Sequence, residues 1–184
     1  YFKLTSYEGG TKTPMIIAGH NIKAAGINHT DRIHVTDMMP TILELTGVKR
    51  PTEYNGKALA PLYGKSYAKL ITGESDAPHR SESETIGFEM IECKSLIKGD
   101  WKVLFEMPPY GEGDHWHLYN LVDDELEQND LSEKYPEKTQ ELIKEWEKYA
   151  KQVGYIKSNG EPQMEEYDNP SEFYQHLGES PAQG

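Results

Sequence analysis

Two histidines with a tryptophan between them are the most suggestive ligand pair in the chain. In His115-Trp116-His117, the i, i+2 spacing places both imidazoles on one side of an extended strand. Two such imidazoles can chelate Zn²⁺. No third ligand follows at a fixed spacing, so we favour a pair of histidines at a sheet edge or in a loop.

A run of acidic residues beginning at Asp123 resembles a calcium loop superficially. It lacks the glycine that such a loop needs at its sixth position, and Lys134 stands where the twelfth-position glutamate would be. We therefore interpret residues 123–130 as an acidic turn that precedes a helix.

Nucleophilic chemistry finds little support. Cys93 is the single cysteine, which excludes an internal disulfide and any CxxC metal site. No motif surrounds it, and a structural thiol in a strand is the favoured interpretation. Seven histidines with many Ser and Asp residues permit a catalytic triad on paper, but neither a nucleophile elbow nor a phosphate-binding glycine motif occurs.

Composition narrows the class of protein further. The chain has 184 residues and a net charge of -12, which suits one domain or a domain with an appendage. This charge, without a basic stretch, argues against nucleic-acid binding. The longest aliphatic run, residues 15–18, is far too short for a membrane helix, so no membrane association is expected. Residues 158–184 hold six acidic residues and no Lys or Arg, and we interpret them as an acidic extension.

The N-terminal third predicts a strand and a helix. The opening residues resemble a loop that ends in Gly9-Gly10, and residues 12–19 then have the pattern of a short buried strand. Thr36 is a candidate N-cap for a helix with Pro40 in its first turn and Gly47 after its end. Its apolar face consists of Met38, Met39, Ile42, Leu43 and Leu45.

The remainder predicts a sheet backed by a helix. A short helix is expected over 66–71 and an antiparallel hairpin over 85–104, with its turn at 98–100 and its second strand at 101–105. Residues 116–120 form another predicted strand. Over 136–153 a 3.6-residue periodicity predicts a helix, with the stripe Leu142, Ile143, Trp146, Tyr149, Ala150 and Val153. Taken alone, the residues predict a mixed α/β module without a complete catalytic site. Such a module would bind a partner, cover another domain or serve as a scaffold.

Three stretches together resemble the C-terminal part of the sulfatase family, especially bacterial arylsulfatases. Residues 3–14 resemble K-x-T-x-[YF]-E-G-G-x-[RK]-x-P, and residues 36–47 resemble the helix D-[IL]-x-P-T-[IL]-L-[ED]-L-[AT]-G. Residues 98–103 and 116–131 resemble the closing G-x-W-K and W-x-L-Y-[DN]-L…E-x-x-[ND]-L elements. The order of the three stretches is that of the family, and together they extend over residues 1–157.

The resemblance implies a fold. Its class is α/β, or α+β within this fragment: the end of an alkaline-phosphatase-like α/β domain, followed by a small antiparallel four-stranded sheet packed by a C-terminal helix. Residues 1–72 would be the end of the large domain, residues 73–157 the small subdomain, and residues 158–184 the acidic extension.

The resemblance also implies hydrolysis of sulfate monoesters. The family's nucleophile is a formylglycine made from a C/S-x-P-x-R motif, assisted by Ca²⁺ held by Asp and Asn side chains. This chain contains no such motif. The calcium ligands and catalytic histidines would lie upstream, so no metal ligand is expected in the fragment, and the fragment alone is expected to be inactive.

One active-site residue carries over. Lys3 stands where the family's sulfate-contacting lysine precedes T-x-[YF]-E-G-G, so the resemblance gives it a catalytic and substrate-binding role. An ammonium group there would offset the charge that grows in the transition state. Glu8-Gly9-Gly10 would hold the loop that aims Lys3. His29 and His34 are interpreted as surface residues or residues at the start of a helix.

Two alternatives stay open: a non-catalytic binding module derived from a sulfatase C-terminal domain, and a phosphate or phosphonate ester hydrolase of the same superfamily. The expected partner is a small-molecule sulfate ester. A partner chain or second copy is also expected to cover the apolar face of residues 1–50, made by Ile16, Ile17, Met38, Ile42 and Leu45. The source is expected to be bacterial, in the periplasm or the cytoplasm, with the periplasm preferred.

Overall fold

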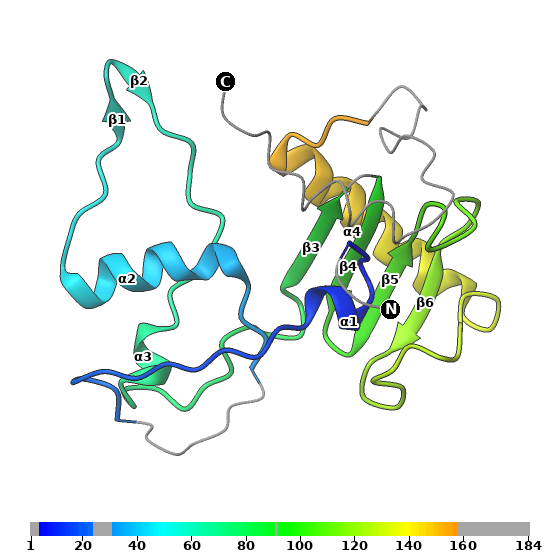
Figure 1. Ribbon diagram of the computed structural model, residues 1–184, viewed down its shortest axis with the longest axis horizontal. Coiled ribbons are helices and arrows are strands. Elements are labelled where there is room, and N and C mark those ends of the chain that lie inside the picture. Colours follow the sequence, from blue (N-terminus) through cyan, green and yellow to red (C-terminus); the bar gives the residue numbers. More distant parts are fainter. Residues whose placement is uncertain (1–3, 24–30, 91, 158–184) are drawn as a thin grey trace, which may run out of the picture.

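The computed structural model describes residues 4–23, 31–90 and 92–157 (Figure 1). The acidic extension at 158–184 lies outside them. The helical elements are α1 (Glu8–Thr11), the 3₁₀ turn η1 (Val35–Asp37), α2 (Met38–Thr46), α3 (Ala68–Ile71) and α4 (Pro136–Val153). The strands are β1 (Glu53–Tyr54), β2 (Lys57–Ala58), β3 (Thr85–Met90), β4 (Cys93–Lys98), β5 (Trp101–Phe105) and β6 (His117–Asn120).

The centre of the fold is a four-stranded antiparallel sheet in the order β3-β4-β5-β6, which confirms the fold class that the resemblance implied. Its register pairs Leu96 with Val103 and Val103 with Leu118, so these three side chains form one row across the sheet. The predicted turn joins β4 to β5, where Gly99 has the positive φ of 56° that suits glycine.

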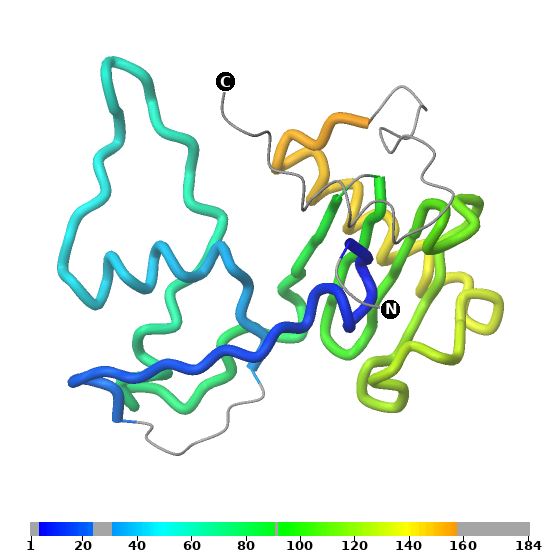
Figure 2. The backbone as a smooth tube through the Cα atoms, in the orientation of Figure 1, coloured from blue at the N-terminus to red at the C-terminus, as the bar shows by residue number. Residues whose placement is uncertain are grey.

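Helix α4 covers one face of this sheet (Figures 1 and 2). Its apolar stripe packs on the row described above, and the shared core consists of Leu96, Val103, Leu118, Leu142, Trp146 and Ala150. Pro136 begins the helix and Gly154 ends it with a φ of 75°. The predicted helix at 136–153 is confirmed at both ends, because its period, starting proline and terminating glycine all agree.

The N-terminal segment lies on the opposite face of the sheet, in front of β4 in Figure 1. Tyr7 belongs there to a core cluster with Ile86, Ile97, Leu104, Tyr119 and Leu121. The sheet is therefore covered on both faces, by the end of the described chain on one and by its beginning on the other.

Between these parts of the sequence, α2 and α3 pack together next to a small core. This region is called the looser unit below. Its core cluster consists of Tyr67, Leu70 and Ile71, with Ile17, Ile22 and Ile33 half-buried against it. The β1–β2 hairpin extends away from the sheet (Figure 2). No helix in the described residues is long and apolar enough to cross a membrane.

One predicted element was wrong and another was incomplete. Residues 12–19 run extended but pair with no other strand in the described chain, and the Ile16 side chain is 95% exposed. A strand needs a neighbour for its backbone hydrogen bonds, and the described residues offer none here. The hairpin predicted at 85–104 contains a further reversal between β3 and β4, where Glu92 has a φ of 64°.

Smaller predictions also need correction. The predicted N-cap Thr36 lies inside η1, and Asp37 stands at the N-cap position of α2. His34 caps η1, and its ring accepts a hydrogen bond from the Thr36 backbone N–H at 3.4 Å. Gly9 and Gly10 form the helical turn α1 rather than a positive-φ loop. The short helix predicted over 66–71 begins only at Ala68.

Gly64 makes the closest backbone approach in this region. A Cβ at Gly64 would lie 2.0 Å from the Thr36 carbonyl oxygen, whereas a Cβ at Gly19 would meet its nearest atom at 3.5 Å. We expect Gly64→Ala to lower the free energy of unfolding by about 1–3 kcal/mol, because the clash is with backbone that cannot swing away. Gly19→Ala is the control and should change it by less than about 0.5 kcal/mol. Urea denaturation of both variants checks this, and equal stability would contradict it.

Candidate functional site

Lys3, the catalytic residue that the resemblance implies, lies outside the described residues. The segment that follows it is well defined. Leu4 has a left-handed φ of 76°, and the next two residues, Thr5 and Ser6, are 2% and 3% exposed. Thr5 and Ser6 are polar yet fully covered, so the chain is fixed against the protein directly after Lys3.

A buried lysine on the sheet holds this segment. Lys102, on β5, has a side chain that is 0% exposed, and its Nζ lies 3.0 Å from Oε1 of Glu8 and 2.8 Å from Oε1 of Glu127. A buried charge is tolerated only where it is paired, and two carboxylates surround this one. The three side chains, Glu8, Lys102 and Glu127, are called the anchor cluster below.

The backbone completes the anchor cluster. The N–H of Glu8 donates to Oε2 of Glu127 at 2.6 Å, so Glu127 contacts both the lysine and the start of α1. Burial raises the pKa of Glu127, although the Lys102 ammonium opposes that rise. Glu127 also has a left-handed φ of 54°. A non-glycine residue in this conformation is costly, which indicates that the surrounding contacts fix it.

A second buried carboxylate contacts the same segment. The backbone N–H of Ser6 donates to Oε1 of Glu106 at 2.5 Å, and Glu106 is 1% exposed. Burial raises the pKa of Glu106. The neighbouring Cys93 is a free thiol whose pKa burial raises to about 12, with Glu106 adding to the rise. A thiol that stays protonated is a poor nucleophile, which agrees with the structural role expected for Cys93.

The anchor cluster joins three of the sequence motifs. Glu8 comes from E-G-G, Lys102 from G-x-W-K, and Glu127 from E-x-x-[ND]-L. The motifs lie far apart in the sequence, with 94 positions between Glu8 and Lys102, so their patterns alone do not pair them. The one sequence feature that could have indicated the pairing is Lys102, a lysine inside a predicted strand, because a charged strand residue that faces a core needs counter-charges.

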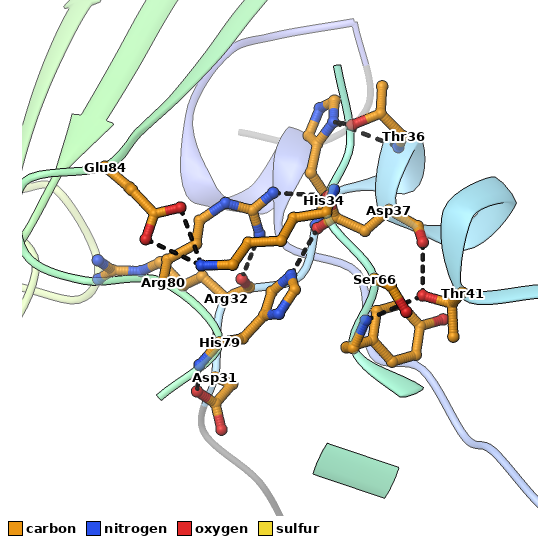
Figure 3. Close-up of polar contacts among 12 residues, drawn as sticks. Asp31, Arg32, His34, Thr36, Asp37, Thr41, Ser66, His79, Arg80 and Glu84 are labelled. Atoms are coloured by element: carbon orange, nitrogen blue, oxygen red, sulfur yellow. Dashed lines mark hydrogen bonds and ion pairs between the residues drawn. The ribbon is translucent and has the colours of Figure 1, made fainter. Parts of the chain in front are cut away.

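A second polar centre, shown in Figure 3, surrounds Asp37 in the looser unit. Asp37 is 0% exposed, and its Oδ1 accepts hydrogen bonds from Arg80 Nη2 at 2.7 Å and from the Lys65 backbone N–H at 2.8 Å. Its Oδ2 accepts from the His34 backbone N–H at 2.8 Å and lies 3.2 Å from Nε2 of His79. One carboxylate thereby joins three chain segments.

Charge balance explains why this buried carboxylate is stable. Burial alone would raise the pKa of Asp37, but the Arg80 guanidinium and the N–H groups of Lys65 and His34 outweigh it and lower that pKa. The backbone oxygen of Asp37 also accepts from the Thr41 hydroxyl at 2.6 Å, and Thr41 in turn accepts from the Tyr67 N–H at 3.0 Å. The motif at 36–47 therefore serves as a structural junction.

The other predicted candidates have the following places. His34 lies at the start of η1 as expected, and His29 lies outside the described residues. In the acidic turn, Oδ2 of Asp124 accepts from the backbone N–H groups of Gln128 and Asn129 at 2.8 and 2.7 Å, which makes this segment a turn before α4. His115 and His117 come together, with ring centroids 4.1 Å apart.

Comparison with known proteins identifies the family to which this chain is similar. The family described as N-sulphoglucosamine sulphohydrolase, C-terminal, matches residues 1–153. Among curated relatives, an uncharacterised sulfatase of Schizosaccharomyces pombe is 28% identical over 151 residues, covering 81% of this chain and 26% of the relative. Arylsulfatase K of Xenopus laevis is 29% identical over 147 residues, covering 78% and 27%. The chain thus spans about a quarter of the length of the curated relatives it matches.

A solved structure supports the fold. A candidate sulfatase from Bacteroides thetaiotaomicron superposes with a TM-score of 0.63 at 20% identity, covering 88% of this chain and 35% of the other. The superposed region is about a third of the longer protein. Since the family match extends over most of its length, this chain belongs to the sulfatase family, within its N-sulphoglucosamine sulphohydrolase C-terminal group.

Proposed function

We propose that this chain is the C-terminal part of an arylsulfatase-like sulfuric ester hydrolase and that it brings Lys3 to the active site of the whole protein. The anchor cluster carries the proposal. It fixes the segment that follows Lys3 onto the sheet through the ion pair between Glu8 and the fully buried Lys102. The Glu8 N–H also donates to Glu127, which is itself paired with Lys102. Such a fixed base is what a charged side chain needs to meet a developing charge in one defined place.

The chemistry proposed for Lys3 is electrostatic. Hydrolysis of a sulfate monoester breaks the bond between sulfur and the ester oxygen, and negative charge grows on that oxygen as the bond lengthens. An ammonium group nearby stabilises this charge more in the transition state than in the substrate. The resemblance supplies the nucleophile, a formylglycine from the upstream part of the protein.

Calcium does not fit the buried carboxylates described here. Glu8 and Glu127 face the Lys102 ammonium, and Asp37 faces Arg80, so a cation already balances each of them. Calcium prefers six to eight oxygen ligands without competing cations. We therefore expect the Ca²⁺ of the intact enzyme to be held by upstream residues, and we assign it no step in this chain.

The exposed apolar side chains around α2 support the view that an upstream domain is adjacent. Ile16, Met38, Ile42 and Leu45 are 95%, 42%, 51% and 42% exposed. We propose that residues 1–72 complete the large α/β domain of the whole protein and that this domain covers these side chains. Residues 73–157 would then be the small subdomain.

The test uses the full-length parent protein and an aryl sulfate. Lys3→Ala should lower kcat/KM by about 100-fold, since removing one preorganised donor typically costs 10²–10³-fold. Lys12→Ala is the matched control, because Lys12 lies on the same segment but forms an exposed ion pair with Glu125. It should retain kcat/KM within about twofold.

The same assay addresses the alternatives. The isolated 184-residue chain should show no turnover, and turnover would contradict the proposal. A parent protein that hydrolyses an aryl phosphate faster than the aryl sulfate would support the phosphate hydrolase. A parent without either activity would support the binding module. The sulfatase relatives favour neither alternative.

A further inference from the structure

The two histidines at the start of β6 have a third neighbour that their sequence spacing does not reveal. Asp130, in the loop before α4, places its Oδ2 atom 2.8 Å from Nδ1 of His117 and 3.9 Å from Nε2 of His115. The three residues offer two nitrogen ligands and one oxygen ligand, and these ligand atoms all lie within 4.8 Å of one another.

Backbone contacts fix the orientation of the carboxylate. Oδ1 of Asp130 accepts hydrogen bonds from the N–H groups of Leu118 and Ser132 at 3.0 and 2.8 Å. With one oxygen committed to the backbone, Oδ2 is the atom turned toward the two imidazoles. A carboxylate held in this way is preorganised as a monodentate ligand.

The rings are oriented as well. Nδ1 of His115 lies 2.5 Å from Oδ1 of Asp114, and this contact favours the tautomer with its proton on Nδ1. The Nε2 lone pair of His115 is then available to a cation. A carboxylate behind a histidine is the usual outer-shell arrangement of zinc sites. His117 stacks on Tyr119 with ring centroids 6.2 Å apart and an interplanar angle of 15°, which holds the second ring.

We propose that His115, His117 and Asp130 bind one divalent transition-metal cation, with Zn²⁺ as the favoured ion and water as the fourth ligand. Tetrahedral zinc with bonds near 2.0–2.1 Å separates its ligand atoms by roughly 3.3 Å. The 2.8 and 3.9 Å spacings bracket that value, so small side-chain rotations complete the site. On binding, the contact between His117 and Asp130 is replaced by bonds from both groups to the cation.

The ligand chemistry separates this site from a calcium site. Two imidazoles and one carboxylate suit zinc, whereas calcium takes mostly oxygen ligands. No metal ligand was expected in this chain because the resemblance places the calcium ligands upstream, and the sequence spacing of the histidine pair offers no third ligand. The proposed cation is therefore additional to the Ca²⁺ that the resemblance implies.

The site has a structural consequence for the fold. It ties the start of β6 to the loop that contains Glu127, three residues before Asp130. Since Glu127 belongs to the anchor cluster, a cation here would stiffen the loop that holds the N-terminal segment. Binding to the folded state alone also raises the melting temperature, by an amount that grows with the free metal concentration.

The experiment is a calorimetric titration of the metal-free 184-residue chain with ZnCl₂. We expect one strong site per chain, with a melting temperature that rises with zinc and is unchanged by CaCl₂. Co²⁺ in place of Zn²⁺ should give the visible absorption of a tetrahedral site with nitrogen and oxygen ligands. Asp114→Asn should weaken zinc binding about tenfold, the lower end of the usual effect for an outer-shell partner. His117→Gln should weaken it by more than that.

His20→Gln is the matched control, because His20 is exposed and remote in sequence from the cluster, and this variant should bind zinc as the original chain does. Far-UV circular dichroism without metal checks that His117→Gln is folded, and His115→Gln replaces it if it is not. Undiminished zinc binding in these two ligand variants, or no binding by the original chain, would overturn the proposal.

Discussion

Lys102→Met should lower the free energy of unfolding by about 3–5 kcal/mol, because it leaves Glu8 and Glu127 close together and without their cation. Removing one partner of a buried ion pair typically costs that much. A whole domain is typically stable by only about 5–15 kcal/mol, so this single change removes a large share. Urea denaturation followed by far-UV circular dichroism measures it.

The pH dependence of the Lys102→Met deficit tests its electrostatic origin. Burial already raises the pKa of Glu127, and the loss of the opposing ammonium raises it further. A carboxyl whose pKa is higher in the folded state favours folding when it is protonated and loses that advantage as pH rises. The deficit should therefore be largest near pH 7 and shrink as pH falls toward about 5.

Two further variants bracket the Lys102→Met result. Lys144→Met removes an exposed lysine from α4 and should change the free energy of unfolding by less than about 0.5 kcal/mol. Adding Glu8→Gln and Glu127→Gln to Lys102→Met removes the uncompensated charges and should restore more than half of the loss. A loss below about 1 kcal/mol in Lys102→Met would show that the cluster is not anchoring the segment.

Asp37→Ala should have a comparable effect, about 3–5 kcal/mol, because it deprives four donors of one acceptor. Arg80, His79 and the backbone N–H groups of His34 and Lys65 all face this carboxylate. Hydrogen exchange of the α2 and α3 amides should accelerate most, because the looser unit depends on this junction. Asp76→Ala, at an exposed aspartate, is the control and should stay within about 0.5 kcal/mol.

Acid titration gives the Asp37 prediction a second readout. The folded-state pKa of Asp37 is lowered, so its contribution to stability is fully present above the unfolded pKa near 3.9. That contribution is lost as pH falls through the lower folded value. The gap between the original chain and Asp37→Ala should thus narrow below about pH 4. A gap that is constant across that range would contradict the assigned role.

Local sequence patterns predicted most elements of the four-stranded sheet and the helix that covers it. Helix α4 has an apolar period, a starting proline and a terminating glycine, and all three agreed with the structure. The β4–β5 turn has Gly99 where a left-handed φ is required. The β3–β4 reversal was missed because Glu92 adopts a left-handed φ without being glycine or asparagine. The Glu92 carboxylate accepts from the Tyr155 hydroxyl at 2.6 Å, a contact across 63 residues that no local pattern predicts.

Local sequence patterns could not predict the polar centres, because the residues that form each centre are far apart in the sequence. Glu8 and Glu127 are 119 residues apart, and Asp37 and Arg80 are 43 apart. Asp130 lies 13 residues after His117, at no spacing that a zinc motif would suggest. The strand predicted at 12–19 failed for a related reason: its apolar pattern calls for neighbouring strands that the described residues do not supply.

The contact between Glu8 and Glu127 also sets an order of events during synthesis. The ribosome releases the N-terminal end of a chain first, but Glu8 pairs with Lys102 on β5 and donates its backbone N–H to Glu127 in the loop before α4. The anchor cluster is therefore complete only after Glu127 has emerged. A chain that stops before residue 127 would contain Lys3 and all the residues of β3–β6, yet lack the carboxylate that joins Lys102 to the start of α1.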